Sequence, residues 1–380
     1  MSAGTVALVA MSVPAVAVAE SQDFAYVTNT TSNSVSVVDL ATNTVTANIP
    51  VGVNPQEVAI APNGARAYVT LSDSDTVSVI DTVSRRVVST IPVGDYPFAV
   101  AVSLDSTRVY VANGLSNTVS VINAATGGVI TTIPVGTLPF GLAVSPGGTR
   151  LYVTNQGDNS VSVIDTATNA IRTTIPVGVA PAGVAFTPKG DRAYVVNLGG
   201  GTISVVDTIT ATVITTIPGG TDPERVAVSR NGTRAYVTNA SSNDVSVINT
   251  ATNTIIATIP VGISPVGVAI SPAGTRAYVA NGGSNTVSVI DLLSNTVIAT
   301  VGVGGSPLGV ATGRLPGQQP ASQSASQPAP RPIQQSEHTV SHKLHLTQTQ
   351  GGHVRDSDFD WDRHRDRRHF NRKAVTWTTR

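Results

Sequence analysis

A constant spacing of tyrosine constrains this chain more than any other feature of its sequence. Seven of the eight tyrosines stand 42 residues apart, with no insertion or deletion between them. They are Tyr26, Tyr68, Tyr110, Tyr152, Tyr194, Tyr236 and Tyr278. Proline recurs with the same step from Pro55 to Pro307, and glycine from Gly52 to Gly304. A period of about 40 residues that contains several short strands is typical of a propeller blade.

Each unit contains four runs that read as strands. In the unit that begins at Pro223, they are RVAVS, RAYVTN, DVSVIN and TIIATIPVG. The runs are short and rich in β-branched residues, and Gly, Asn and Ser separate them. No window holds the 3.6-residue period of a helix. The sequence therefore predicts an all-β protein, a seven-bladed β-propeller with four-stranded antiparallel blades of 42 residues.

The two ends of the repeat predict how the ring closes. The first strand-like run, FAYVTN at 24–29, matches the second run of a unit, and the last, PLGVAT at 307–312, matches a first run. The last blade is therefore expected to combine N- and C-terminal strands. Such closure removes the exposed edges that an open array would leave.

The segments that flank the repeats have a different composition. The first 19 residues lack charge and end in Ala17-Val18-Ala19, which resembles a signal peptide cleaved before Glu20, although no basic residue precedes the apolar run. A start codon placed too late, or an uncleaved anchor, are the alternatives. We expect a signal peptide at 1–19, the propeller at 20–313, a Pro/Gln/Ser-rich disordered linker at 314–340 and a basic disordered tail at 341–380.

The zero net charge of the chain hides an asymmetry between the body and the tail. Residues 20–313 hold 12 Lys+Arg and 17 Asp+Glu, a balance of −5, and residues 314–380 hold 11 and 6, a balance of +5. An acidic body argues against nucleic acid as a partner of the propeller. The tail is interpreted as a solvated segment, or as a basic arm for a polyanion. No later segment is apolar enough to span a membrane, so we expect no transmembrane span in the mature chain.

The motifs AYVTN, SVSVID and TIPVG resemble those of the YVTN-repeat β-propeller family, which includes YncE-like and surface-layer-type proteins. The resemblance covers residues 24–313 and implies an exported or surface protein. Related propellers act as lactonases, or bind haem d1 or copper. All six histidines lie in the tail and the chain has no cysteine, so the repeats offer no histidine ligand. We therefore predict no cofactor, no metal and no catalytic residue.

Residues that recur in every unit are expected to serve the fold. The seven tyrosines of the series are predicted to pack within or between blades. The column Asp39, Asp81, Asn123, Asp165, Asp207, Asn249 and Asp291 starts a turn, where a short side chain can bind backbone N–H groups two residues on. The arginines that precede each second strand could pair with that column or with carbonyl groups. The asparagines that end the second strand are assigned a turn role.

Function is expected where the units differ. After each recurring proline the next two residues vary, and in a propeller they should ring the mouth of the central channel. The candidate binding residues there are Gln56, Glu57, Tyr96, Phe98, Phe140, Glu224 and Arg225. The aromatic residues are expected on one side of the mouth and the charged residues elsewhere. Neutral drift at exposed loops is the alternative.

The sequence favours a non-enzymatic binding scaffold, secreted or at the cell surface or in the periplasm, whose partner is an unidentified envelope protein or glycan. Two other functions remain open. One is a lactonase-like hydrolase that uses the carboxylates of the channel mouth. The other is a structural component of a surface layer.

Overall fold

The computed structural model describes residues 22–316, and these form 28 β-strands in seven four-stranded antiparallel sheets. The predicted all-β, seven-bladed propeller is confirmed. Within this part of the chain there is no helix, and thus none with the length and apolar character needed to cross a membrane. The predicted signal peptide, nearly all of the linker and the basic tail lie outside the described residues.

Every blade has an inner, a second, a third and an outer strand. The inner strands are β28 (Pro307–Arg314), β4 (Pro55–Ile60), β8 (Pro97–Val102), β12 (Pro139–Val144), β16 (Pro181–Phe186), β20 (Pro223–Val228) and β24 (Pro265–Ile270). The second strands are β1 (Asp23–Asn29), β5 (Arg66–Leu71), β9 (Arg108–Asn113), β13 (Arg150–Asn155), β17 (Arg192–Asn197), β21 (Arg234–Asn239) and β25 (Arg276–Asn281).

The other two strands complete each blade. The third strands are β2 (Ser34–Asp39), β6 (Thr76–Asp81), β10 (Thr118–Asn123), β14 (Ser160–Asp165), β18 (Thr202–Asp207), β22 (Asp244–Asn249) and β26 (Thr286–Asp291). The outer strands are β3 (Thr44–Pro50), β7 (Arg86–Pro92), β11 (Val129–Pro134), β15 (Ala170–Pro176), β19 (Thr212–Pro218), β23 (Thr254–Pro260) and β27 (Thr296–Gly302).

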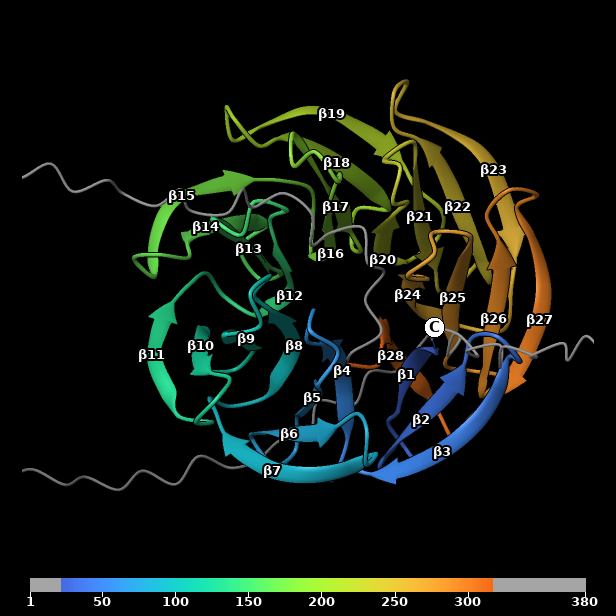
Figure 1. Cartoon of the computed structure of the whole chain (residues 1–380). Helices are drawn as coiled ribbons and strands as arrows, with labels where there is room; N and C mark the ends of the chain where they lie inside the picture. The colour runs from blue at the N-terminus through green and yellow to red at the C-terminus, as the bar shows by residue number, and fades with distance from the viewer. Residues whose placement is uncertain (1–21, 317–380) are drawn as a thin grey trace, which may run out of the picture. The chain divides into compact units, whose positions relative to one another are not determined.

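The seven blades form a closed ring whose inner strands surround a common axis (Figure 1), and we call the region around this axis the channel. We number them in ring order: blade 1 contains β28 and β1–β3, blade 2 contains β4–β7, and so on to blade 7 with β24–β27. Each inner strand contacts the inner strands of both neighbouring blades, and β28 contacts both β4 and β24. The channel is therefore lined by seven strands that all run in the same direction, away from their prolines.

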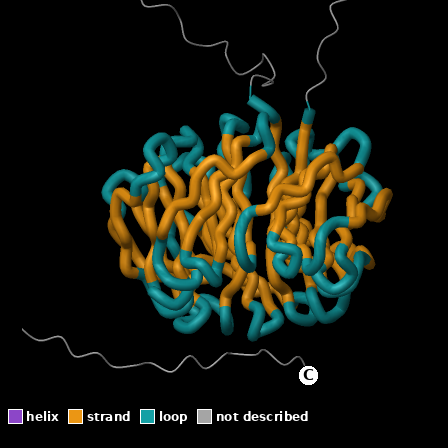
Figure 2. Tube along the Cα trace, turned by 90° about the horizontal axis from the view of Figure 1, so that it is seen from below, coloured by secondary structure: helices purple, strands orange, loops and turns teal. Residues whose placement is uncertain are grey.

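Blade 1 joins the two ends of the described chain, as the split repeat predicts. Asp23 of β1 pairs with Arg314 of β28, and an ion pair with a nitrogen–oxygen distance of 2.8 Å links their side chains. Because β1 starts and β28 ends at this pair, both described ends lie at one face of the propeller (Figure 2). We call this the opposite face, and the face where the inner strands begin the mouth face.

The core lies between blades, because the middle strands bury both faces while the outer strands bury little. Third strands such as β6 have four consecutive buried residues, whereas β3 alternates between exposed and half-buried residues. The seven tyrosines of the series are at most 2% exposed. Tyr68 of blade 2 packs in a cluster with Val100 and Ile122 of blade 3. The repeated tyrosines thus fill the joints between neighbouring sheets.

In five of the seven blades, the arginine that starts the second strand binds the next blade. Arg192 donates to the carbonyl of Thr250 at 2.9 Å, and Arg234 donates to that of Leu292 at 2.8 Å. Arg276 crosses the seam and donates to the carbonyl of Leu40 at 2.9 Å. Of the two partners that the sequence left open, these arginines thus bind carbonyl groups. The carbonyl belongs to the residue that follows the Asp/Asn column of the neighbouring blade.

The buried asparagines of the second strands do more than form turns. Asn239 is fully buried, and its Nδ2 donates to Asp244 Oδ1 at 2.6 Å and to Ser246 Oγ at 2.9 Å, across the hairpin. A Cβ on Gly220 would lie 2.3 Å from Asn239 Cγ. The recurring glycine is therefore required because an asparagine side chain fills the space beside it.

Candidate functional site

The residues that vary between blades lie where each inner strand begins, and a β-bulge sets their position. In blade 2 the register between β4 and β5 shifts between Pro55 and Val58, so that Gln56 and Glu57 occupy the bulge. The Thr70 hydroxyl accepts a hydrogen bond from the Glu57 backbone N–H at 3.0 Å and donates to the carbonyl of Phe98 at 2.8 Å. Bulges redirect side chains from the plane of a sheet. Here the threonine holds the bulge and also connects it to the next blade.

Four of these side chains meet at the channel and form what we call the mouth cluster: Glu57, Phe98, Phe140 and Arg225. The rings of Phe98 and Phe140, from blades 3 and 4, stack with centroids 3.8 Å apart and an interplanar angle of 25°. The guanidinium carbon of Arg225, from blade 6, lies 4.7 Å from the Phe140 centroid and 5.4 Å from that of Phe98. A cation at such distances is attracted to the negative face of the ring.

Arg225 also spans the channel to blade 2. Its Nε donates to Glu57 Oε2 at 3.4 Å, although the two residues are 168 positions apart in the sequence. The Arg225 side chain is 11% exposed and that of Glu57 17% exposed, so the ion pair is largely removed from water. One cation therefore links an aromatic pair and a carboxylate contributed by three other blades. A pair with this burial is screened less than a surface salt bridge.

Burial also sets the ionisation of the carboxylates near the channel. Removal from water raises the pKa of Glu57, while the charge and hydrogen bonds of Arg225 and the Val58 backbone oppose that rise. Burial likewise raises the pKa of Glu224, with Arg225 opposing and Asp222 adding to the shift. The mouth thus places two carboxylates of raised pKa beside one guanidinium.

The surroundings of Glu57 and Arg225 show how the cluster is packed and which of its polar atoms is unpaired. A Cβ on Gly309 of blade 1 would lie 2.6 Å from Glu57 Oε1, so this glycine leaves the space that the carboxylate uses. Arg225 Nη2 is buried and makes no hydrogen bond within residues 22–316. Gly309 was not among the candidate residues, although its place in the varying pair after Pro307 was visible in the sequence.

The structure brings some of the candidate residues together and leaves others apart. The sequence led us to expect aromatic and charged residues in separate sectors, but Arg225 lies over both phenylalanine rings. Gln56 is buried and turns toward its own blade, where its Nε2 donates to Asn54 Oδ1 at 2.9 Å and to Ser72 Oγ at 3.1 Å. Tyr96 is 38% exposed and lies in the loop before Pro97.

The loops of the mouth face are tied to one another. The backbone N–H of Tyr96 donates to Asp75 Oδ1 at 2.9 Å, and the N–H of Leu138 donates to Asn117 Oδ1 at 2.9 Å. Both acceptors adopt positive φ, of 54° and 55°, as short polar residues in turns do. These bonds connect the turn between the second and third strands to the loop that enters the next blade. The mouth therefore presents a connected surface rather than separate loops.

The acidic residues of the propeller are dispersed rather than grouped as metal ligands. No set of three or more His, Cys, Asp or Glu side chains in the described part of the chain is arranged to hold a metal ion. All six histidines lie outside the described residues. Chemically, the mouth cluster joins aromatic faces, a guanidinium and a carboxylate that mainly contact one another, since Phe98 is 9% exposed and the Arg225 side chain 11%.

The seven four-stranded sheets and the closure of blade 1 by both chain ends define a seven-bladed β-propeller. A family model described as a YNCE-like beta-propeller matches residues 180–276. This match and the seven-bladed ring support the resemblance of the chain to YncE-like propellers. No curated protein has a sequence that matches this chain.

Solved structures share the fold at low sequence identity. A functionally unknown protein from Desulfotomaculum acetoxidans DSM 771 is 21% identical, with a TM-score of 0.70 over 77% of this chain and 99% of that one. A candidate 6-phosphogluconolactonase from Bacteroides fragilis NCTC 9343 is 18% identical, with a TM-score of 0.68 over 78% and 99%. Hydrazine synthase from Kuenenia stuttgartiensis is 21% identical, with a TM-score of 0.63 over 68% and 95%. These similarities establish the fold and leave the activity open.

Proposed function

We propose that this protein is a non-enzymatic binding scaffold of the cell envelope, exported from the cytoplasm, whose mouth face recognises an envelope protein or glycan. The observation that carries the proposal is the mouth cluster. Side chains from four blades converge there, at positions where the other blades carry small or aliphatic residues. Aromatic residues and arginine are enriched among the residues that dominate binding energy at interfaces.

The contacts of Glu57 support a binding role. Its Oε2 atom accepts a hydrogen bond from Arg225 at 3.4 Å, so this carboxylate helps to hold the arginine over the aromatic pair. The location of both described ends on the opposite face is a second support. A chain held from that side would leave the mouth face accessible. Export itself rests on the apolar N-terminal segment, which lies outside the described residues.

A binding survey of the full-length protein against extracts of the cell envelope tests this proposal. Phe98→Ala, Phe140→Ala and Glu224→Gln should each weaken the detected interaction. Leu293→Ala serves as the matched control, because Leu293 is 90% exposed on a turn of the opposite face. Interactions that survive all three mouth substitutions would show that the proposed face is wrong.

A lactonase-like hydrolase is the second candidate, and one observation favours it. Burial raises the pKa of Glu224, and no ion pair of this side chain occurs within the described residues. A carboxyl group with a raised pKa suits general acid–base catalysis near neutral pH. Lactone hydrolysis by the wild type that is lost in Glu57→Gln or Glu224→Gln would support this candidate. A wild type without lactonase activity would remove it.

A structural role in a surface layer is the third candidate. The outer strands β19, β23 and β27 carry no charged residue and expose Ile214, Ile256 and Ile298, each 48% exposed. Uncharged outer edges can pair with another chain. Assembly of the pure protein into sheets would favour this role, and a monodisperse monomer would argue against it.

A further inference from the structure

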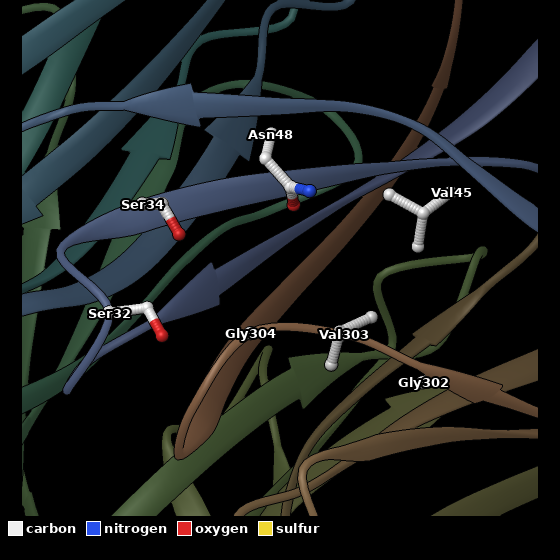
Figure 3. A pocket seen from close by; sticks show the side chains of 7 residues that line it. All are labelled: Ser32, Ser34, Val45, Asn48, Gly302, Val303 and Gly304. Carbon is white, nitrogen blue, oxygen red and sulfur yellow. The ribbon is translucent and has the colours of Figure 1, made fainter.

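A pocket on the mouth face lies at the seam where the ring closes. It has a volume of about 350 Å³ and lies between blade 1 and the link from β27 to β28. Figure 3 shows the side chains of Ser32, Ser34 and Asn48 on the blade 1 side and Val303 on the link. Small-molecule sites begin at about this volume.

The pocket coincides with two departures from the repeat. The residue that ends the outer strand is proline in six blades and Gly302 in blade 7. A Cβ at Gly302 would meet no atom within 4 Å, so the space that a proline ring covers elsewhere is open here. The third residue from the end of the outer strand is Asn48 in blade 1 and threonine in the other six blades. At these two positions the seam differs from every other joint, because one has no side chain and the other carries an amide.

The polar groups of this pocket are held in place but keep unused hydrogen-bonding capacity. Asn48 is exposed; its carbonyl oxygen accepts from the Ser36 hydroxyl at 2.8 Å, whereas its Nδ2 has no hydrogen-bond partner among residues 22–316. The Ser32 hydroxyl oxygen accepts from the Gly305 N–H at 2.7 Å, and that of Ser34 accepts from Asn29 Nδ2 at 3.1 Å. Both hydroxyl hydrogens can therefore be donated to a ligand.

The chemistry of the lining selects a class of ligand. No charged side chain lines the pocket, which gives a charged group no partner to compensate its desolvation. Val45 and Val303 supply apolar contacts beside the amide and the hydroxyls. A hydroxyl-rich ring with apolar C–H faces, the size of one hexose, matches this combination of groups.

We propose that the seam pocket is a binding site for one neutral sugar residue, with Asn48, Ser32 and Ser34 as its hydrogen-bonding groups. This inference rests on the proposed function, because that function allows an envelope protein or a glycan as the partner and the inference selects the glycan. It adds a subsite at the rim of the mouth face, formed by residues outside the mouth cluster.

Saturation-transfer NMR on the full-length protein tests the site with glucose, galactose, mannose and N-acetylglucosamine, and with glucuronate as a charged probe. We expect at least one neutral sugar to bind. Gly302→Pro restores the residue of the other six blades, whose outer strands keep the same register, and should therefore fold. It should weaken binding at least about tenfold by covering the pocket. Asn48→Thr, the second restoring variant, should act in the same direction.

Thr300→Asn is the matched control, because Thr300 is the equivalent residue in blade 7 and does not line the pocket. It should bind the sugar as the wild type does. The proposal is overturned if no neutral sugar binds, if glucuronate binds as well as the neutral sugars, or if binding survives both restoring variants. The envelope survey depends on Phe98 and Phe140, which are not part of this pocket. A failure to bind sugar would therefore leave the survey result unchanged, and failure of this site can be told from failure of the proposed function.

Discussion

The joints between blades and the mouth of the channel are built on opposite plans. At the joints, every blade uses the same tyrosine, and six of the seven use the same arginine and the same asparagine–glycine pair, to solve a packing problem that all blades share. At the mouth, the two residues after the recurring proline vary between blades, and side chains from four blades form a single cluster. The repeated residues therefore report on stability, and the residues that interrupt the repeat report on recognition. Substitutions can test both halves of this comparison.

The largest effect is expected at a joint. Tyr236 is fully buried and its hydroxyl makes no hydrogen bond within the described residues. Tyr236→Ala should cost about 4 kcal/mol of unfolding free energy, because it leaves a large cavity. Tyr236→Phe should be close to neutral, since the lost hydroxyl has no partner. Denaturant titration of both variants measures the two values, and a mild effect of Tyr236→Ala would contradict the assigned packing role.

The next effect is expected in the mouth cluster. Arg225→Ala removes the partner of the largely buried Glu57 carboxylate and should cost roughly 3 kcal/mol. In the double variant Arg225→Ala/Glu57→Gln, part of this loss should return, because no unpaired charge remains. A double-mutant cycle measures the coupling of the two residues. Additive effects would mean that the ion pair does not operate in solution.

A smaller effect is expected where glycine faces asparagine. Gly220→Ala places a Cβ 2.3 Å from Asn239 Cγ and should cost about 2 kcal/mol through overpacking. The control is Gly147→Ala, where a Cβ meets nothing within 4 Å and no loss from contact is expected. Thermal unfolding midpoints compare the two. Equal midpoints would show that the asparagine can move aside.

The smallest effect is a difference in the pH dependence of the two regions. Backbone hydrogen bonds from the turns, first from Thr168 and Thr210, lower the pKa of Asp165 and Asp207, so their contribution is lost as the pH falls below about 3.8. Burial raises the pKa of Glu57, so the folded state binds the proton more tightly and stability falls as the pH rises above about 4.5. Glu57→Gln should weaken only the second dependence, and the raised pKa of Glu224 should account for the remainder. Denaturant titration from pH 3 to pH 8 measures the free energy of unfolding at each pH. If Glu57→Gln leaves the decrease above about pH 4.5 unchanged, burial of Glu57 is not its cause.

The sequence was sufficient for the fold because the period of 42 residues fixes the blade, and the split unit fixes the closure. It was not sufficient for the mouth cluster. Glu57 and Arg225 are four units apart, and whether they meet depends on the width of the channel and the reach of an arginine side chain. No spacing within one unit contains that information. We expected separate aromatic and charged sectors because the order of the blades was the only information in the sequence. The length of the Arg225 side chain brings its charge over the two phenylalanine rings.

The role of the asparagines was also only partly predictable. Their place at a strand end suggested a turn, but the burial of Asn239 depends on Gly220 of the connection into its blade. The second unit departs from this pairing. There Leu71 replaces the asparagine, and the glycine beside it, Gly52, alone in its column adopts a φ of +126°. The glycine itself is unchanged in the sequence, so only the structure shows that the two positions are in contact.

The central claim is that the mouth face is the recognition surface. Photo-crosslinking in the cells that make the protein tests it most directly, with p-benzoylphenylalanine placed either at Tyr96 on the mouth face or at Leu293 on the opposite face. Both side chains are exposed, at 38% and 90%, so neither replacement disturbs the core. The account predicts an adduct with an envelope component from position 96 and none from position 293. Adducts from position 293 alone, or equal adducts from both positions, would contradict it.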